Sequence, residues 1–432
     1  MNQTIAEKII SQHVGRPVRA GEVVIVPVAG AMATDTTAPL AIRAFREMGG
    51  TRLWDSARVS LVIDHAAPAP NERIANLHKM MRDFAAEMGC HFYDVGEGIC
   101  HQLMVENDHV RPGDIFLGAD SHTPTYGALG AFAVGVGSTD LAATWLTGQT
   151  WLKVPGSIKV VLNGRLPLGV TAKDVILRLV GQLGIAGATY DAVEFTGTAV
   201  HPLTLASRMT LANMVAEMGA KTALVDTAGL TLPYPFTPTL PDPDAAYRAV
   251  IELDVSGLRP QIAIPHSPDN VVDIDRVIGR KIDAAFIGSC TNSRLEDLQA
   301  AAAVLNGRSL APHVRLIVAT ASKRVFNQAL QEGTIATLAA AGATFITSGC
   351  GPCVGTHQGV PGNGEVVISS ANRNFRGRMG NPHAEVYLAS PAVVAAAAAA
   401  GEIVDPEIFM TKDGGPTTEE MLSVFRLPSS VG

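Results

Sequence analysis

Three of the five cysteines lie in two short, glycine-containing motifs that suit metal binding. Cys290 stands in Gly-Ser-Cys-Thr-Asn-Ser, and Cys350 and Cys353 stand in Ser-Gly-Cys-Gly-Pro-Cys-Val-Gly. Four thiolates close a four-iron cluster, so three leave one iron open to a substrate, which indicates chemistry rather than electron storage. A Cys-x2-Cys pair alone is also typical of a tight turn or half a zinc site. His357, close after Cys353, keeps zinc open as an alternative.

Histidines and neighbouring carboxylates form a second group, which suits acid–base chemistry. They are Asp64, His65, His101, Asp120 and His122, and each follows a predicted strand or lies in a glycine-rich turn. An aspartate beside a histidine can orient the imidazole and tune its basicity, which suits proton transfer to a departing hydroxyl. A single histidine in such a place is more often structural, but three of them favour a site.

Asn213 and Glu217 lie in a run of mostly apolar residues, 209–218. Their i, i+4 spacing predicts that they share one face of a helix. Because the rest of that helix is apolar nearly all round, we expect it to be buried and the carboxylate to have a partner. The alternative is an exposed polar stripe on an amphipathic helix.

The segment Asn-Arg-Asn-Phe-Arg-Gly-Arg at 372–378 places three guanidinium groups in seven residues. Arginine binds carboxylates through two parallel hydrogen bonds, so this loop suits a di- or tricarboxylic acid. A solvated basic loop or a phosphate contact are the alternatives. A Walker-type phosphate loop does not occur in the sequence, and the glycines of 130–137 are too generic to indicate a nucleotide.

Short apolar runs alternate with helical stretches along the chain, and these elements must position the chemistry. The predicted strands are 23–27, 61–63, 114–117, 158–162, 284–287, 314–318, 344–346 and 365–368, and the predicted helices include 171–180, 294–305, 324–331 and 391–400. This alternation predicts mainly parallel sheets covered by helices. Ligands of open α/β sheets bind beyond the carboxyl ends of strands, so we expect the clusters to meet in one cleft.

Two helix starts are also predicted. Thr171-Ala-Lys-Asp has the pattern of a capping box. Asn292 or Ser293 is placed to cap the helix that follows Cys290, and the positive end of that helix would favour the thiolate of Cys290.

The length of 432 residues exceeds the size at which one hydrophobic core keeps growing, so two or three domains are expected. Boundaries are predicted near Pro155 and Gly279, and the segment 233–243, rich in Pro, Thr and Asp, predicts a surface loop. Hydrophobic residues make up 47% of the chain and charged residues 17%, with 42 glycines and 26 prolines. That composition is typical of compact α/β domains joined by tight turns.

Charge and hydropathy argue against two classes of partner. The net charge is −7 and basic residues are scattered, which speaks against nucleic acid. Apolar runs such as 393–400 fall far short of the ~20 residues that cross a bilayer, and the first residues lack a signal-peptide pattern. We therefore expect a cytoplasmic protein without membrane attachment. Five cysteines, an odd number, indicate reduced thiols, with Cys90 and Cys100 outside the metal site.

With these residues in view, the chain resembles the aconitase superfamily, and most closely the large subunits of two-subunit 3-isopropylmalate dehydratases and homoaconitases. Four motifs carry the resemblance in the order of the family: Gly-Ala-Asp-Ser-His-Thr from Gly118, Gly-Ser-Cys-Thr-Asn-Ser from Gly288, Cys-Gly-Pro-Cys from Cys350, and Asn-Arg-Asn-Phe-Arg-Gly-Arg from Asn372. Similarity runs over essentially the whole length.

The resemblance implies roles for the residues above. Cys290, Cys350 and Cys353 would hold a [4Fe–4S] cluster, with Asn292 and Asn372 beside it. Its open iron would act as a Lewis acid on a hydroxyl and a carboxylate of the substrate. The implied catalytic residues are Asp64, His65, His101, Asp120, His122 and Glu217, and the implied substrate-binding residues are Ser121, Asn213, Arg373 and Arg378.

The resemblance also implies an architecture. It predicts three α/β/α domains with mainly parallel sheets around a central cluster-binding cleft: 1–156, 157–279 and 280–432, the last with the cluster cysteines. A fourth, mobile domain supplies the proton-abstracting serine in single-chain relatives, and no such segment is found here. We therefore expect a heterodimer with a separate small subunit of about 160 to 200 residues. This chain alone would be inactive.

The implied activity is that of a hydro-lyase that isomerises a 2-hydroxy diacid through an unsaturated intermediate. 2-Isopropylmalate of leucine biosynthesis is the first candidate, and homoaconitate, citramalate or maleate, and 2,3-dimethylmalate are alternatives. A non-catalytic iron–sulfur sensor or an RNA-binding protein is a more distant one. Two departures weaken the substrate assignment: Ala33-Thr-Asp-Thr-Thr37 stands where His-Asp-Gly-Thr is expected, and Ala-Ala-Pro-Ala-Pro follows Asp64-His65.

Overall fold

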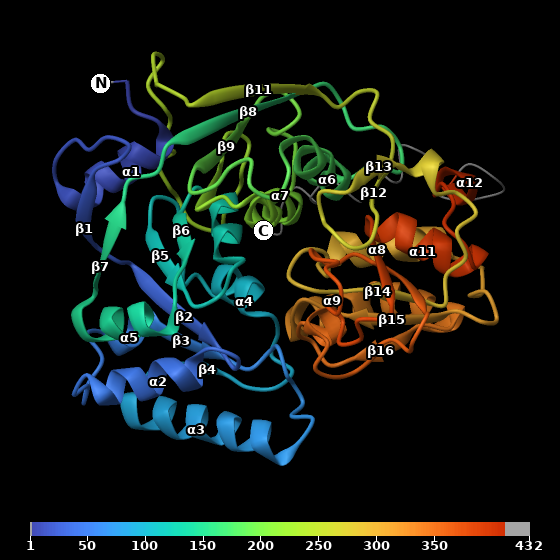
Figure 1. Ribbon diagram of the computed structural model, residues 1–432, viewed down its shortest axis with the longest axis horizontal. Coiled ribbons are helices and arrows are strands. Elements are labelled where there is room, and N and C mark those ends of the chain that lie inside the picture. The colour runs from blue at the N-terminus through green and yellow to red at the C-terminus, as the bar shows by residue number, and fades with distance from the viewer. Residues whose placement is uncertain (1, 411–432) are drawn as a thin grey trace. The chain divides into compact units, whose positions relative to one another are not determined.

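The computed structural model describes residues 2–410, and the chain divides into two compact units (Figure 1). Unit 1 comprises Met1–Arg165 and Gln182–Ser256, and unit 2 comprises Leu166–Gly181 and Gly257–Gly432. Both units are α/β with mainly parallel sheets, which confirms the predicted fold class. The division into three domains at 156 and 279 stays a prediction.

The first sheet of unit 1 has five strands, all parallel, in the order β4-β3-β2-β5-β6. The strands are β2 (Gly30–Thr34), β3 (Val59–Val62), β4 (His91–Tyr93), β5 (Ile115–Gly118) and β6 (Phe132–Gly135). β2, β3 and β5 are buried along their whole length, as expected of parallel strands covered on both faces. Their carboxyl ends therefore lie at one edge of the sheet.

A second parallel sheet of unit 1 has the order β10-β9-β8-β11. Its strands are β8 (Ser157–Asn163), β9 (Ala192–Thr196), β10 (Thr222–Val225) and β11 (Ala249–Asp254). A two-stranded antiparallel ribbon pairs β1 (Val23–Pro27) with β7 (Gln149–Lys153). The segment 233–243 has neither helix nor strand, as the sequence predicts.

Helices flank the five-stranded sheet, and Figure 1 shows α2, α3 and α5 together on one side of it. The helices and 3₁₀ turns of unit 1 are α1 (Ile5–Val14), α2 (Ala38–Glu47), η1 (Ser56–Arg58), α3 (Glu72–Met88), α4 (Cys100–Glu106), η2 (Thr123–Leu129), α5 (Ser138–Thr147), α7 (Leu205–Met214) and η3 (Val215–Met218). Aromatic side chains join three of them: Phe84 of α3 packs edge-on against Phe45 of α2 and stacks on Trp145 of α5. These rings lie in the buried core of unit 1.

Unit 2 is built on a seven-stranded sheet with the order β13-β12-β18-β17-β14-β15-β16. The strands are β12 (Gln261–Ala263), β13 (Val271–Asp273), β14 (Ala284–Ile287), β15 (Arg315–Ala319), β16 (Thr344–Ile346), β17 (Val366–Ser369) and β18 (Glu385–Leu388). The five from β18 to β16 are parallel, and β12 and β13 add antiparallel pairs at one side.

The helices of unit 2 pack around this sheet (Figure 1). They are α6 (Ala172–Leu183, most of which belongs to unit 2), η4 (Ile274–Arg276), α8 (Leu295–Leu305), α9 (Lys323–Gln331), α10 (Thr334–Ala341), η5 (Gly351–Val354), α11 (Pro391–Ala400) and α12 (Glu407–Met410). α11 begins with Pro391 and is otherwise Val and Ala, so it buries nearly all its surface against β14, β17 and α8. Across residues 2–410 the structure contains no helix with the length and apolarity that a membrane span requires.

Candidate functional site

In unit 1, polar residues follow three adjacent strands of the five-stranded sheet. Asp35 comes after β2, Asp64 and His65 come after β3, and Asp120 comes after β5. Because these strands are parallel, the four residues share the carboxyl edge of the sheet, where ligands of such sheets bind.

The carboxylate of Asp120 is shared by three histidines. Its Oδ1 accepts a hydrogen bond from Nε2–H of His101 at 2.9 Å and one from the backbone N–H of His122 at 2.8 Å. Its Oδ2 lies 3.4 Å from Nε2 of His65. Burial alone would raise the pKa of Asp120, but His101, and then His122 and His65, hold it well below its ordinary value. Asp120 is therefore an anion around which imidazoles gather.

Each of these histidines has a second polar partner. His65 Nδ1 lies 2.8 Å from Oδ1 of Asp64, and His101 Nδ1 lies 3.1 Å from the hydroxyl of Tyr126. His122 Nε2 lies 2.8 Å from Oε1 of Glu217. Imidazoles held at both nitrogens keep a defined orientation and can pass a proton between their partners. All predicted acid–base residues of unit 1 thus belong to one connected network.

Asn213 and Glu217 join the same network from the second half of unit 1. Both are buried, which excludes the exposed stripe, and Asn213 Nδ2 donates to the hydroxyl of Thr125 at 2.9 Å. That hydroxyl in turn donates to the carbonyl of His122 at 2.6 Å. The single helix predicted for both residues is wrong: α7 ends at Met214 and Glu217 lies in the 3₁₀ turn η3.

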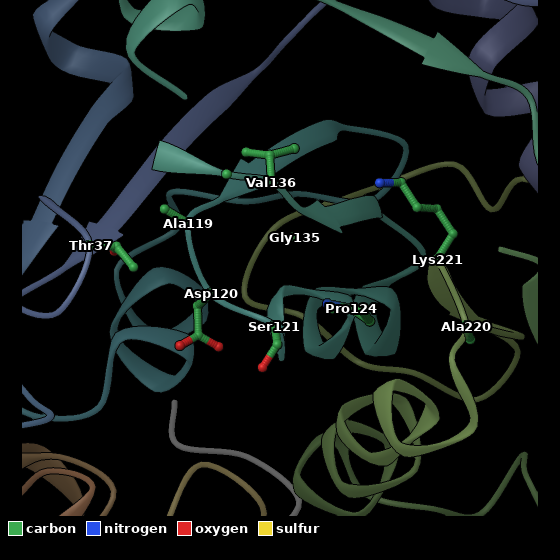
Figure 2. A pocket seen from close by; sticks show the side chains of 10 residues that line it. Thr37, Ala119, Asp120, Ser121, Pro124, Gly135, Val136, Ala220 and Lys221 are labelled. Atoms are coloured by element: carbon green, nitrogen blue, oxygen red, sulfur yellow. The ribbon is translucent and has the colours of Figure 1, made fainter. Parts of the chain in front are cut away.

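A cavity of about 480 Å³ opens beside this network. Figure 2 shows the Asp120 carboxylate and the Ser121 hydroxyl side by side, extending in the same direction from the segment after β5. Thr37 and Lys221 also line it, and burial lowers the pKa of Lys221. Ser121 is exposed, so its hydroxyl is accessible to a small ligand.

In unit 2, the segment after β14 folds back on itself around Cys290. Ser289 has a φ of 73°, a left-handed conformation that residues other than glycine rarely adopt. The hydroxyl of Ser293 donates to the carbonyl of Ser289 at 2.7 Å, and Gly288 and Asn292 pair across the turn. This turn holds Cys290, which is buried, beyond the carboxyl end of the strand.

Two of the three predicted metal-ligating cysteines, Cys290 and Cys353, lie against Asn372. Cys350 and Cys353 are buried at the turn η5 after β16, where Cys353 N–H donates to the carbonyl of Cys350 at 3.4 Å. Asn372, which follows β17, donates from Nδ2 to Sγ of Cys290 at 3.4 Å, and its Oδ1 lies 3.9 Å from Sγ of Cys353. Arg378 Nη2 donates to Sγ of Cys353 at 3.5 Å. Amide and guanidinium donors thus face the sulfurs.

The arginines of the 372–378 motif differ in their surroundings. Arg373 and Arg378 are half-buried, whereas Arg376 is exposed and donates to the carbonyl of Pro382 at 3.5 Å. The binding of substrate by Arg373 and Arg378 stays a prediction.

Lys173 is a fully buried cation that holds the segment before Asn372. Its Nζ donates to the carbonyl oxygens of Ser370 and Ala371, both at 2.7 Å. Burial lowers the pKa of Lys173 to about 7, against the raising effect of Asp297 and other nearby acidic groups.

Arg294 holds the segment of Cys290 in the same way. Its guanidinium donates to the carbonyl oxygens of Thr291 and Cys290, both at 2.7 Å. Asp297 accepts from the side chain of Asn292 and from the backbone N–H of Arg294, each at 2.9 Å. Burial raises the pKa of Asp297 and lowers that of Arg294.

The two predicted helix starts have different outcomes. Asp174 accepts from the backbone N–H of Thr171 at 2.8 Å, which is one of the two bonds of a capping box, but the hydroxyl of Thr171 accepts from the backbone N–H of Lys173 at 3.2 Å. The N-cap of α8 is Arg294, so the capping of this helix by Asn292 or Ser293 is wrong.

The donor set of unit 2 fits a metal centre held by three cysteines. None of the five cysteines, all within the described residues, is in a disulfide. Cys90 and Cys100 belong to unit 1, where burial raises the pKa of Cys90 to about 11. Three buried cysteines, two of them with a hydrogen-bond donor beside the sulfur, match the thiolate ligation and surrounding hydrogen bonds of an iron–sulfur cluster. His357, the extra zinc ligand considered above, is buried in the same unit.

Several residues of these networks are missing from the sequence predictions. Asp35, Tyr126 and Thr125 support the histidines of unit 1, and Lys173 and Arg294 support the cysteine segments of unit 2. Asp35 follows β2, a strand that the sequence analysis did not predict. Lys173 and Tyr126 bond to segments distant in sequence, which no local pattern reveals.

Comparison with known proteins places the chain in one family. The profile of the Aconitase family (aconitate hydratase) matches residues 7–281 and 275–401. The chain is 49% identical over 418 residues to "3-isopropylmalate dehydratase large subunit 1" of Methanopyrus kandleri, covering 95% of this chain and 100% of that one. It is 50% identical to the "Homoaconitase large subunit" of Thermus thermophilus, covering 94% and 98%. A "3-isopropylmalate dehydratase large subunit 1" of Thermotoga maritima is 48% identical, covering 95% and 100%.

Proposed function

The chain belongs to the aconitase family, and from that premise we propose that it is the large, cluster-binding subunit of a [4Fe–4S] hydro-lyase. The reaction is the isomerisation of a 2-hydroxy diacid by loss and re-addition of water. A C–O bond and a C–H bond break on adjacent carbons, water leaves, and a carbon–carbon double bond forms. Re-addition of water in the opposite sense moves the hydroxyl.

The observation that carries this proposal is the set of three buried cysteines in unit 2, of which Cys290 and Cys353 have their sulfurs against Asn372. Cys290, Cys350 and Cys353 would hold the cluster, with Asn372 and Asn292 beside it. When bound, a three-cysteine cluster supplies Lewis acidity toward the hydroxyl and a carboxylate of the substrate. Asn372 and Arg378 donate hydrogen bonds to the sulfurs of Cys290 and Cys353.

The histidine network of unit 1 supplies the proton for the departing hydroxyl. His101 is held between Asp120 and Tyr126, so its imidazole can give up a proton and regain it without reorienting. His65, oriented by Asp64, and His122, oriented by Glu217, adjoin Asp120. Because Asp120 stays ionised, it stabilises whichever imidazole is protonated.

The remaining predicted residues bind the substrate. The guanidinium groups of Arg373 and Arg378 suit its carboxylates, and Ser121 and Asn213 supply neutral hydrogen-bonding groups. The group that removes the carbon-bound proton is assigned to a small-subunit partner, because the matched relatives are named large subunits. The cytoplasmic location and the lack of nucleic-acid and membrane partners stay predictions.

2-Isopropylmalate, a substrate of leucine biosynthesis, is the proposed first substrate. It is supported by the names of the Methanopyrus and Thermotoga relatives. Homoaconitate is the second candidate, because the Thermus homoaconitase subunit is as similar as they are.

The test is to co-express the chain with its small subunit, restore iron and sulfide without oxygen, and follow the absorbance of the unsaturated acid. The panel is 2-isopropylmalate, homoaconitate, citramalate, maleate and 2,3-dimethylmalate. We expect turnover to be fastest on 2-isopropylmalate. No turnover on any of these acids would refute the proposed hydro-lyase activity. Faster turnover of homoaconitate than of 2-isopropylmalate would make homoaconitate the preferred substrate.

Two further measurements address the other classes. Metal analysis that finds zinc without sulfide would replace the cluster by a zinc site held with His357. Filter binding at low salt tests the RNA-binding alternative, for which the net charge of −7 is unfavourable.

A further inference from the structure

Asp35 is a buried carboxylate in the stretch Ala33–Thr37, which departs from the pattern expected of the family. It follows β2, which lies between β3 and β5 in the sheet. Hydroxyl groups close the turn around it: Thr34 N–H donates to Oγ1 of Thr37 at 3.2 Å, and the hydroxyls of Thr34 and Thr36 lie 2.9 Å apart. The threonines thus form hydrogen bonds with one another, and the Asp35 side chain is available to bond to a neighbouring segment.

That neighbouring segment is the turn after β3. Asp35 Oδ1 accepts from the backbone N–H groups of Asp64 and His65 at 3.2 and 2.9 Å, and its Oδ2 accepts from that of Ala66 at 2.8 Å. His78 Nε2 of α3 lies 3.4 Å from Oδ2. A carboxylate that binds three consecutive N–H groups fixes the path of that backbone.

The environment keeps this carboxylate ionised. Only 1% of its side chain is exposed. Burial alone would raise its pKa, but the bond to His78, the charge of His65 and the backbone donors lower it to about 2. At neutral pH the turn is therefore bound to a full negative charge.

The turn held by Asp35 carries two of the proposed catalytic residues. Asp64 uses Oδ1 for His65 and Oδ2 for the backbone N–H of Cys100 at 2.8 Å, so its position sets the imidazole. His65 Nε2 then lies 3.4 Å from Asp120. A displacement of 64–66 would move both contacts at once.

We propose that Asp35 is a positioning residue for the reaction, which fixes the Asp64–His65 turn against Asp120 without touching the substrate. This inference rests on the proposed function. It also gives the departing stretch at 33–37 a structural role, because three hydroxyls shape the turn from which the aspartate reaches its partners.

The test compares Asp35→Asn with the wild-type heterodimer. Asparagine keeps the size but presents an NH₂ group to backbone donors, so the turn must shift. Misplacing a catalytic group by about 1 Å costs roughly 100-fold in rate, so we expect kcat to fall about 10- to 100-fold. KM and the iron and sulfide content should stay within twofold. The pH dependence of kcat should also shift, which loss of packing alone would not cause.

Two variants sharpen the result. Asp35→Glu keeps the charge but moves the carboxylate by one methylene, so it should also lose kcat by at least fivefold, even if Asp35→Asn does not fold. Asp94→Asn is the control: Asp94 follows β4 of the same sheet, and its carboxylate pairs with exposed Arg82. It should keep full kcat.

The inference is overturned if Asp35→Asn or Asp35→Glu keeps wild-type kcat, or if the loss falls on KM or iron content instead. Hydrogen exchange of the backbone at 64–66 gives a readout that needs no turnover. It should rise in Asp35→Asn and stay unchanged in Asp94→Asn. A wild-type complex without activity would refute the proposed function, while unchanged exchange at 64–66 would refute this inference alone.

Discussion

The histidine network of unit 1 and the cysteine segments of unit 2 hold their charged groups in different ways. In the histidine network, ionisable side chains form hydrogen bonds with one another. The Asp120 carboxylate accepts from His101, and Glu217 lies 2.8 Å from His122. In unit 2, the buried cations Lys173 and Arg294 donate to main-chain carbonyl oxygens. The sulfurs of unit 2 face neutral or cationic donors.

This difference indicates two roles. Imidazoles between carboxylates can exchange protons at little cost because either partner accepts the charge, so unit 1 is suited to moving protons. Lys173 and Arg294 instead donate to backbone carbonyl oxygens, which take up no proton, and they place positive charge beside the cysteine segments. Unit 2 is thus suited to holding an anionic group such as a thiolate-ligated cluster.

The largest effect is expected in unit 2 from Cys350→Ser. Loss of one of three thiolates should remove most bound iron and, with it, Lewis acidity worth several kcal/mol, roughly a 10³-fold or greater loss of activity. Iron analysis and turnover measure both. Cys90→Ser, a change in unit 1, is the control and should keep iron and activity. If Cys350→Ser keeps its iron, the proposed cluster site in unit 2 is wrong.

The next largest effect is expected in unit 1 from Asp120→Asn. Without the anion, the shared histidines lose the group that stabilises their protonated forms, and kcat should fall roughly 10²- to 10⁴-fold. Iron content should not change. Asp114→Asn, at the other end of β5, should keep kcat because the Asp114 carboxylate accepts from the backbone N–H of Arg111, away from the histidine network. An equal loss of iron in Asp120→Asn would contradict the separation of roles between the units.

The sequence predicted some of the strands well and missed others. β14 and β16 matched their predicted ranges because they are short apolar runs closed by turn residues. β2, Gly-Ala-Met-Ala-Thr, was missed because it lacks β-branched residues until its last position, although it is buried on both faces. With β2 missed, Asp35 had no strand to follow and was not recognised as a supporting residue.

The cation network of unit 2 could not be predicted for a different reason. Lys173 was placed in a helix start, but its partners lie almost 200 residues later. A lysine at the first turn of a helix is ordinarily a solvated residue, and nothing local indicates burial. The convergence of the two sets of residues on one cleft stays a prediction from strand ends.

A third prediction tests whether the cation of unit 2 is truly fixed by its backbone partners. Lys173 has a pKa of about 7 in the folded chain and 10.5 as its ordinary value. The unfolded chain therefore binds more protons between these values, so the wild type gains stability as pH rises through that window. In Lys173→Met this gain is lost, and from pH 7 to 9 the wild type should gain about 2 kcal/mol relative to the variant.

Urea unfolding of the metal-free chain at several pH values measures this difference. Lys281→Met is the control, because Lys281 is exposed and pairs with Glu402. Its stability difference from the wild type should not vary with pH in this window. A constant difference for Lys173→Met as well would mean that Lys173 keeps an ordinary pKa in the folded chain.

The smallest effect is expected from Arg378→Lys, which asks whether the donors around the sulfurs also serve the substrate. Lysine keeps the charge but loses the fork that can bind a carboxylate and Cys353 Sγ together. One charged hydrogen bond lost costs about 1.5 kcal/mol, roughly a tenfold rise in KM. Arg376→Lys, two residues away on the exposed part of the loop, should leave KM unchanged. If Arg378→Lys instead loses iron while KM stays unchanged, Arg378 supports the cysteine ligands and does not bind the substrate.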